Sequence, residues 1–172
     1  MNLEELTRQY DFRDRVMVVT GGAGVLGGEI ACALAGCGAR VAVVDRKPEE
    51  AGRLPERLGG SADRLLVLGG DVLEKDSMEQ AARRIVEAWG GIDGLVNAAG
   101  GNHPGATTGA EQSFFDLPGS ALRSVADLNL LGTIIPSQPF GRVMAERKAG
   151  VILNVYSMNA FRPLTRIPAY SA

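Results

Sequence analysis

The stretch Val16-Met-Val-Val-Thr-Gly-Gly-Ala-Gly-Val-Leu-Gly27 decides how this chain folds. Its first five residues are apolar or β-branched without interruption, which is typical of a strand buried on both faces. Four glycines follow within seven residues and predict a tight turn. A helix is then predicted over Val25–Gly36, because apolar residues recur in it at helical spacing. A strand, a glycine-rich turn and a helix in this order can bring backbone N–H groups close to a pyrophosphate.

The same alternation continues along the rest of the chain. A polar helix is predicted to begin at Pro48 and end at Gly59-Gly60, and a long helix over about 119–147 is expected to be disturbed near Pro136 and Pro139. Repeated strand–helix units predict an α/β fold, a doubly wound parallel sheet with helices on both faces, in a single domain of residues 1–172. The further predicted strands are Val41–Asp45, Leu65–Leu68, Leu95–Asn97 and Val151–Val155, and Ser77–Gln80 fits a capping box before another helix.

Composition limits the classes of partner. Apolar residues make up 45% of the chain and charged residues 22%, with a net charge of −2. These values give no reason to expect binding to nucleic acid or to an anionic membrane. No apolar run is long enough for a transmembrane helix, and the acidic N-terminus lacks the apolar core of a signal peptide, so we expect a cytoplasmic protein. No metal site is expected, because the single His103 has no partners at ligand spacing.

Acidic and small residues follow the predicted strands where an open α/β sheet binds its ligands. Asp45 lies eighteen residues beyond Gly27 and is well placed for the two ribose hydroxyls of NAD, whereas it would repel a 2′-phosphate. Arg46 follows at once and can bind such a phosphate, so NADP stays open. Asp71 can accept from an adenine amine, or it can be an N-cap or a solvated acid. The predicted cofactor-binding residues are Gly21, Ala23, Gly24, Val25, Leu26, Gly27, Asp45, Arg46, Asp71, Val72, Asn97, Ala98, Ala99 and Gly100.

The end of the chain carries the outline of a carbonyl-reduction site. Ser157 follows the last predicted strand, and Tyr170 comes thirteen residues later. The serine hydroxyl can hold a substrate oxygen while the tyrosine phenol exchanges a proton with it. A phenol needs a nearby cation for this at neutral pH, and the helix turn that would supply one lies beyond Ala172.

Taken together, these motifs resemble the short-chain dehydrogenase/reductase family from Arg15 to Ala172. The resemblance implies a Rossmann fold and hydride transfer with a nicotinamide cofactor. It implies that Tyr170 is the acid/base, that Ser157 anchors the substrate oxygen, and that Asn129 steadies a water in a proton relay. Val25 stands where the family has the middle glycine of the turn. The family's lysine, four residues after the tyrosine, and its two further strands have no counterpart here, so we expect a C-terminally incomplete fold.

The substrate is predicted from a weaker resemblance. The segments 100–104, 114–117 and 157–161 look like D-mannonate oxidoreductases (fructuronate reductases), which implies a small-molecule sugar acid. The Gly- and Thr-rich loop 100–118 would then lie on the substrate side. An arginine at 162 or 166 could bind a carboxylate with two hydrogen bonds, or be a solvated loop charge. The predicted substrate residues are Asn102, Asn159, Arg162 and Arg166.

Two alternatives stay open. The chain can be a nucleotide-binding fragment without catalysis, or the same chemistry can act on a neutral sugar, a polyol or an oxoacyl substrate. For the full-length enzyme we expect a homo-oligomer, either a dimer or a tetramer. For residues 1–172 alone we expect poor solubility or self-association, because the predicted strand Val151–Val155 would leave an apolar sheet edge unpaired.

Overall fold

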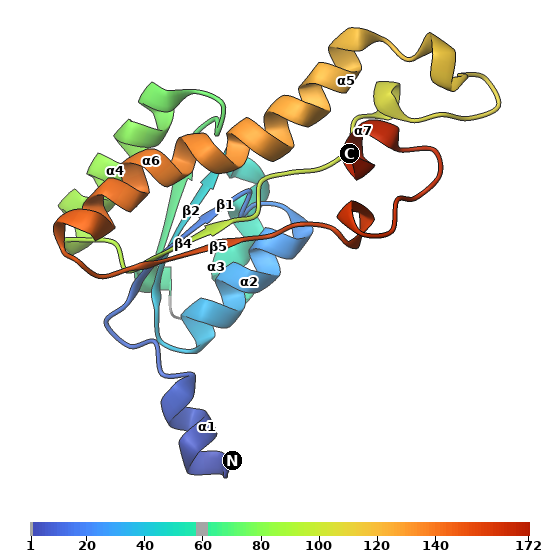
Figure 1. Ribbon diagram of the computed structural model, residues 1–172. Coiled ribbons are helices and arrows are strands. Elements are labelled where there is room, and N and C mark those ends of the chain that lie inside the picture. The colour runs from blue at the N-terminus through green and yellow to red at the C-terminus, as the bar shows by residue number, and fades with distance from the viewer. Residues whose placement is uncertain (1, 58–61) are drawn as a thin grey trace.

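The computed structural model describes residues 2–57 and 62–172. A sheet of five parallel strands forms its centre, in the order β3-β2-β1-β4-β5 (Figure 1). The chain starts in the middle of the sheet, proceeds to one edge and then crosses to the other side of β1, so the switch point lies between β1 and β4. The strands are β1 (Val16–Thr20), β2 (Arg40–Asp45), β3 (Leu65–Gly69), β4 (Gly94–Asn97) and β5 (Val151–Asn154). This confirms the predicted doubly wound α/β fold.

Helices cover both faces of the sheet, as the strand–helix alternation predicts. The helices are α1 (Leu3–Gln9), α2 (Val25–Gly36), α3 (Leu54–Arg57), α4 (Lys75–Trp89), α5 (Gly119–Ala126), α6 (Gly132–Glu146) and α7 (Pro168–Ser171). Met17 and Val19 of β1 pack in one core cluster with α2 and α3. Val16 and Val18, on the other face of the same strand, pack in a second cluster with α4 and α6. Because successive side chains of a strand alternate between its faces, one apolar strand serves both layers.

The start of α4 corrects one prediction. The helix begins at Lys75, with Glu74 as its N-cap and no side-chain capping bond, so Ser77–Gln80 is not a capping box. The Ser77 hydroxyl instead accepts a hydrogen bond from the backbone N–H of Asp71, at 3.1 Å. The serine therefore ties the loop after β3 to the first turn of α4.

The long helix predicted over 119–147 is distorted earlier than expected. A π-helical segment, Asp127–Leu131, separates α5 from α6, and both Pro136 and Pro139 lie inside α6. A proline ring ordinarily collides with the carbonyl four residues before it, which for Pro136 is that of Gly132. Gly132 has ψ −10, well away from the usual helical value, so its carbonyl is turned aside. The distortion therefore precedes the proline that it accommodates.

Between Pro48 and β3 the chain forms a 3₁₀ turn, Pro48–Arg53, and then the short α3. The predicted end of this helix at Gly59-Gly60 lies outside the described residues. Cys32 and Cys37 are both free and partly exposed, with Cys37 just past the end of α2. Within residues 2–57 and 62–172, no helix has the length and apolarity needed to cross a membrane, and no three potential metal ligands come together.

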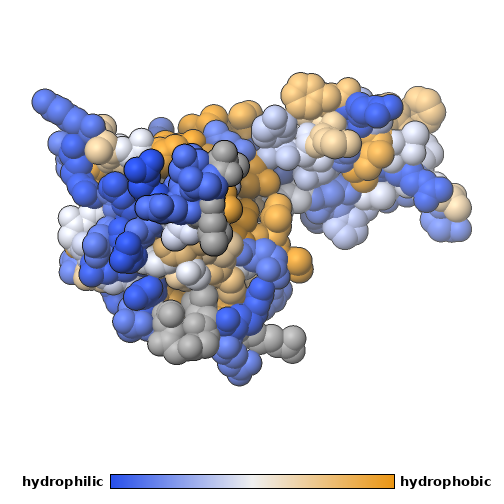
Figure 2. All heavy atoms as spheres, turned by 90° about the horizontal axis from the view of Figure 1, so that it is seen from below, coloured by the Kyte–Doolittle hydropathy of each residue, from blue (hydrophilic) through white to orange (hydrophobic). Residues whose placement is uncertain are grey.

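The segment 100–118 projects from the sheet as a lobe together with α5 and α7 (Figure 1). Ala106, Ala121 and Val125 form a small core in this lobe, and Ala169 and Tyr170 pack against it. Seen from below, apolar atoms gather in the middle of the molecule, where the lobe joins the body (Figure 2). The lobe thus has its own packing, which carries α7 and its tyrosine.

The strand β5 forms one edge of the sheet in the described part of the chain, with β4 as its partner. All four of its residues are exposed, including Val151 (58%) and Leu153 (55%). This is unusual for a parallel strand, since parallel sheets normally have both faces covered.

Candidate active site

The glycine-rich turn after β1 is packed so closely that side chains are excluded from it. Gly21 adopts φ +65, and an added Cβ atom there would lie 2.7 Å from the Cα atom of Ala99. A Cβ atom on Gly27 would collide with the carbonyl oxygen of Gly21. The backbone N–H of Gly24 donates to that same carbonyl, at 3.1 Å, and closes the turn. Glycine at 21 and 27 therefore keeps the turn compact.

The turn leads into the N-terminus of α2, which is open to a cleft. Gly24 is the N-cap and makes no side-chain capping bond. Val25 is 89% exposed and Leu26 56%, so the first turn of the helix is not covered by other side chains. The first N–H groups of a helix lack intrahelical partners and carry a partial positive charge. This geometry suits a phosphate group.

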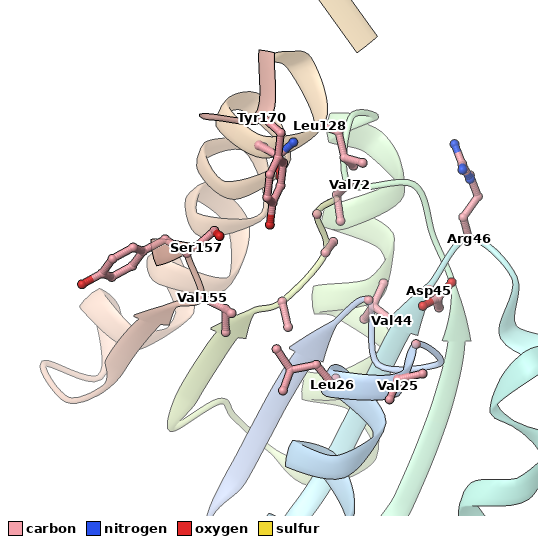
Figure 3. A pocket seen from close by; sticks show the side chains of 18 of the residues that line it. Val25, Leu26, Val44, Asp45, Arg46, Val72, Leu128, Val155, Ser157 and Tyr170 are labelled. Atoms are coloured by element: carbon pink, nitrogen blue, oxygen red, sulfur yellow. The ribbon is translucent and has the colours of Figure 1, made fainter. Parts of the chain in front are cut away.

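Asp45, at the end of β2, is tied to the glycine-rich turn. One carboxylate oxygen accepts from the backbone N–H of Ala23 at 3.1 Å, and the other accepts from Lys47 N–H at 3.0 Å. Both bonds hold the carboxylate at the wall of the cleft, where Arg46 also lies. Figure 3 shows the Arg46 side chain extending away from Val25 and Asp45.

Two further strand ends line the cleft. After β3, one Asp71 carboxylate oxygen accepts from the N–H of Leu73 at 2.9 Å, so the acid orders its own loop while it faces the cleft with Val72. After β4, Thr20 Oγ1 lies 3.2 Å from the N–H of Ala98 and 3.4 Å from that of Ala99. These hydrogen bonds from backbone N–H groups to the Thr20 side chain place the small residues that follow β4 beside the glycine-rich turn.

Asn97 does not line the cleft but lies beneath it, with a relative exposure of 2%. Its amide nitrogen donates to Ser137 Oγ at 3.0 Å and to Asn154 Oδ1 at 2.9 Å. The three side chains join β4, α6 and β5. Asn97 therefore braces the ends of β4 and β5.

Asn129 lies on the π-helical segment and holds the segment after β4. Its amide nitrogen donates to the carbonyl oxygens of Gly101 and Val125, both at 2.8 Å, and its Oδ1 accepts from Gly101 N–H at 3.0 Å. Gly100 must be small, because an added Cβ atom would lie 2.9 Å from Asn129 Oδ1. Both amide hydrogens of Asn129 are thus used by backbone oxygens.

The predicted catalytic hydroxyls enter the same cleft from two different elements. Ser157 follows β5, and its Oγ accepts from Asn159 N–H at 3.2 Å, which leaves its O–H free to donate. Tyr170 reaches the cleft from α7, which rests on the lobe (Figure 3). The lobe therefore brings the tyrosine back over the carboxyl end of the sheet.

The cleft has a volume of about 920 Å³ and combines the predicted nucleotide-binding and catalytic residues. Of those predicted, the following line it: Gly21, Gly24, Val25, Leu26, Gly27, Asp45, Arg46, Asp71, Val72, Ala98, Ala99, Gly100, Asn129, Ser157 and Tyr170. The glycine-rich turn and the Ser157–Tyr170 pair thus meet at the switch point of the sheet, where open α/β sheets bind their ligands.

The sequence model of a protein family, described as short chain dehydrogenase, matches residues 15–172 of this chain. The chain belongs to the short chain dehydrogenase family. This family membership confirms the resemblance seen in the sequence and makes the chain part of an oxidoreductase family.

Several relatives are similar over nearly all of this chain. An uncharacterized oxidoreductase of Bacillus subtilis is 36% identical, with 92% of this chain and 60% of the relative covered. A D-threitol dehydrogenase of Mycolicibacterium smegmatis is also 36% identical, with 98% of this chain and 63% of the relative covered. The chain thus spans about three fifths of the length of these relatives.

The solved structures agree with this fold. A protein of Haemophilus influenzae, provisionally described as a D-mannonate oxidoreductase and crystallised with bound NAD, superposes with a TM-score of 0.86 at 33% identity. That alignment covers 96% of this chain and 63% of the other. An NAD⁺-bound xylitol dehydrogenase has a TM-score of 0.82 at 25% identity, with 93% and 59% covered.

The predicted substrate residues lie outside the main cleft of this short-chain dehydrogenase domain. Asn102 is exposed and donates to Thr107 Oγ1 at 2.8 Å, and Asn159 is buried. Arg162 is exposed, and Arg166 lines a second hollow of about 410 Å³ between the lobe and the loop before α7. Their roles toward a substrate therefore stay predictions.

Several residues that line the main cleft were not predicted. They are Val44, Lys47, Glu50, Gly70, Leu128, Val155, Tyr156, Met158, Ala160 and Ala172. The two charged residues, Lys47 and Glu50, follow the end of β2 by two and five residues. Their short separation from Asp45 in the sequence could have identified them.

Proposed function

We propose that this protein is an NAD-dependent short-chain oxidoreductase that moves a hydride between nicotinamide and a carbonyl or hydroxyl carbon of a sugar acid, such as fructuronate or mannonate. The observation that carries the proposal is the meeting of the glycine-rich turn with Ser157 and Tyr170 in one cleft. A nucleotide-binding domain without catalysis would not need a serine and a tyrosine at the same switch point.

The residues of the cleft fit a nicotinamide dinucleotide. Gly21 and Gly27 leave room for backbone contact with a pyrophosphate, and the uncapped start of α2 offers free N–H groups. The Asp45 carboxylate accepts two backbone N–H bonds and retains lone pairs for ribose hydroxyls. When bound, the dinucleotide supplies or accepts the hydride.

In the reduction direction, Ser157 and Tyr170 act on the substrate oxygen. The Ser157 hydroxyl already accepts one bond from Asn159 N–H, so its proton is directed to another acceptor, which we assign as the substrate carbonyl oxygen. Tyr170 then donates the phenolic proton as negative charge develops on that oxygen, and it takes the proton back in oxidation.

Asn129 supports the site mainly through the backbone that it holds. Its amide group donates both hydrogens to the carbonyls of Gly101 and Val125. A proton relay at this residue would therefore use its Oδ1, its backbone or a bound water. We retain the relay as part of the proposal. By holding Gly101, the side chain also shapes the nicotinamide side of the cleft.

A sugar acid is favoured over other substrates by the sequence resemblance, by the provisional description of the Haemophilus influenzae protein, and by two arginines on the loop between Ser157 and Tyr170. Arg166 stands beside the second hollow, which shares Ala172 with the main cleft. A carboxylate that bridges the two hollows would meet this guanidinium.

A neutral polyol is the second candidate substrate. It is favoured by the relative described as a D-threitol dehydrogenase, which is 36% identical to this chain. We further propose a cytoplasmic location, a homo-oligomeric assembly, and contact of segment 100–118 with substrate.

The proposal is tested on a complete version of the enzyme, by measuring NADH oxidation with fructuronate and with a neutral ketose. Tyr170→Phe should lower kcat by roughly 10²–10⁴-fold, because proton transfer is lost, while NADH binding is kept. Arg166→Ala should weaken the binding of fructuronate by roughly tenfold, because a charge-assisted hydrogen bond to its carboxylate is lost. The binding of the neutral ketose should not change. Equal losses for both substrates would refute the sugar-acid assignment. Full activity of Tyr170→Phe would refute the chemistry.

A further inference from the structure

The rim of the cleft beyond β2 carries a pair of opposite charges that the proposed reaction does not use. The Lys47 ammonium lies 2.8 Å from the Glu50 carboxylate, and both residues line the cleft. Their side chains are 60% and 55% exposed, so the pair adds little to the stability of the fold. Any effect of this pair on function therefore comes from the charges that it places at the rim of the cleft.

The local backbone sets the geometry of this pair. The N–H of Lys47 donates to Asp45 at 3.0 Å, and the N–H of Glu50 donates to the carbonyl of Lys47 at 3.0 Å. Pro48 starts the 3₁₀ turn between them. The turn thus presents the acid three residues after the lysine and on the same side. The hydrogen bond that the Lys47 ammonium donates to the Glu50 carboxylate is the main cause that raises the pKa of this ammonium.

We propose that Glu50 is a specificity-determining residue: it disfavours nucleotides with a 2′-phosphate by holding the Lys47 ammonium that would otherwise bind this phosphate. The inference rests on the proposed function, in which the adenosine ribose lies at Asp45. A phosphate monoester carries close to two negative charges and needs a free cationic donor. Glu50 occupies the ammonium of Lys47, which follows Asp45 by two residues and lines the same cleft.

This assignment divides the discrimination between two acids with different roles. Asp45 accepts from the ribose hydroxyls and repels the phosphate directly. Glu50 acts through Lys47 and touches neither the ribose nor the reacting atoms, so it changes the choice of nucleotide without changing the chemistry. Arg46, which extends away from Asp45 in Figure 3, is not held by this turn.

The test uses ADP-ribose and 2′-phospho-ADP-ribose as probes, with affinities measured by calorimetry, because neither requires the nicotinamide half of the site. Glu50→Gln should strengthen binding of 2′-phospho-ADP-ribose by about fivefold or more, because the Lys47 ammonium is then free to bind the phosphate. Binding of ADP-ribose should change by less than about twofold.

Glu49→Gln is the matched control, because it removes the same charge from the adjacent exposed residue, which does not line the cleft. It should change the 2′-phosphate preference by less than about twofold. The double variant Lys47→Met/Glu50→Gln should lose the gain seen with Glu50→Gln alone.

Three results would overturn the inference. An unchanged preference in Glu50→Gln, with ADP-ribose still bound, refutes the inference and leaves the proposed function intact. A gain that persists without Lys47 shows direct repulsion and refutes the role given to the lysine. Failure of ADP-ribose to bind the unaltered protein refutes the proposed function, and this inference with it.

Discussion

At the scale of single residues, adding one methyl group at Gly27 should strongly weaken the binding of the nucleotide. A methyl group there meets the carbonyl of Gly21, so the turn must open and the backbone moves away from the pyrophosphate. Gly27→Ala should weaken NADH binding by roughly tenfold or more, as measured by the fluorescence of the bound nicotinamide.

Gly36→Ala provides the matched control for this prediction. Gly36 is the last residue of the same helix, and an added Cβ atom there meets nothing within 4 Å. NADH binding should be kept, and stability should be unchanged or increase by up to about 1 kcal/mol. If both alanine variants bind NADH normally, the packing of Gly21 against Gly27 does not form the nucleotide site.

Asp45 allows a sharper test of the preference for NAD. Asp45→Asn removes the charge but keeps an amide oxygen that can accept from Ala23 N–H. We expect NADPH to bind relatively better to this variant, because the repulsion of the 2′-phosphate is lost. Asp45→Ala should weaken both NADH and NADPH, since the turn also loses its anchor. Equal binding of NADH and NADPH by the unaltered protein would contradict the role given to Asp45.

At the scale of elements, the π-helical segment holds the loop after β4 through one side chain. Asn129→Asp replaces the amide donor by a carboxylate that faces the carbonyls of Gly101 and Val125. Since two partly buried acceptors then lose their donor, the free energy of unfolding in urea should fall by about 1–3 kcal/mol.

Asn102→Asp is the comparison for this element. Asn102 is exposed, and its partner Thr107 can redirect its hydroxyl proton from the exposed carbonyl of His103 to a carboxylate. The free energy of unfolding of this variant should fall by less than about 0.5 kcal/mol. If the two variants were equally stable, Asn129 would not be what holds the loop.

At the scale of the whole molecule, β5 presents an apolar edge. A polypeptide of residues 1–172 should self-associate through this strand, because its backbone groups and its exposed Val151 and Leu153 can pair with another copy. Leu153→Lys should shift its sedimentation toward the monomer, since a charge on an edge strand disfavours pairing. Gln138→Lys adds the same charge at an exposed position of α6 and should leave the association unchanged. A monomeric unaltered polypeptide would contradict this prediction.

What could be predicted from the sequence was the part that depends on neighbours along the chain. The strand Val16–Thr20 follows from an uninterrupted apolar run, the tight turn from its glycines, and the acid at the end of the next strand from its spacing, and all three are local properties of the sequence. Local patterns also misled where a competing contact existed. Ser77 matched a capping box but binds Asp71 N–H, and the helix is distorted before Pro136 rather than at it.

The fold class, the family and the residue types of the site could all be inferred from the amino-acid sequence. Which of those residues meet is visible in the folded protein alone: Ser157 and Tyr170 join the turn in one cleft, while Arg166 faces a second hollow. The tertiary structure also placed Glu50 on Lys47 at the rim. The physical reason is that hydrogen bonds and side-chain packing between elements distant along the chain fix these positions, and no local periodicity records them.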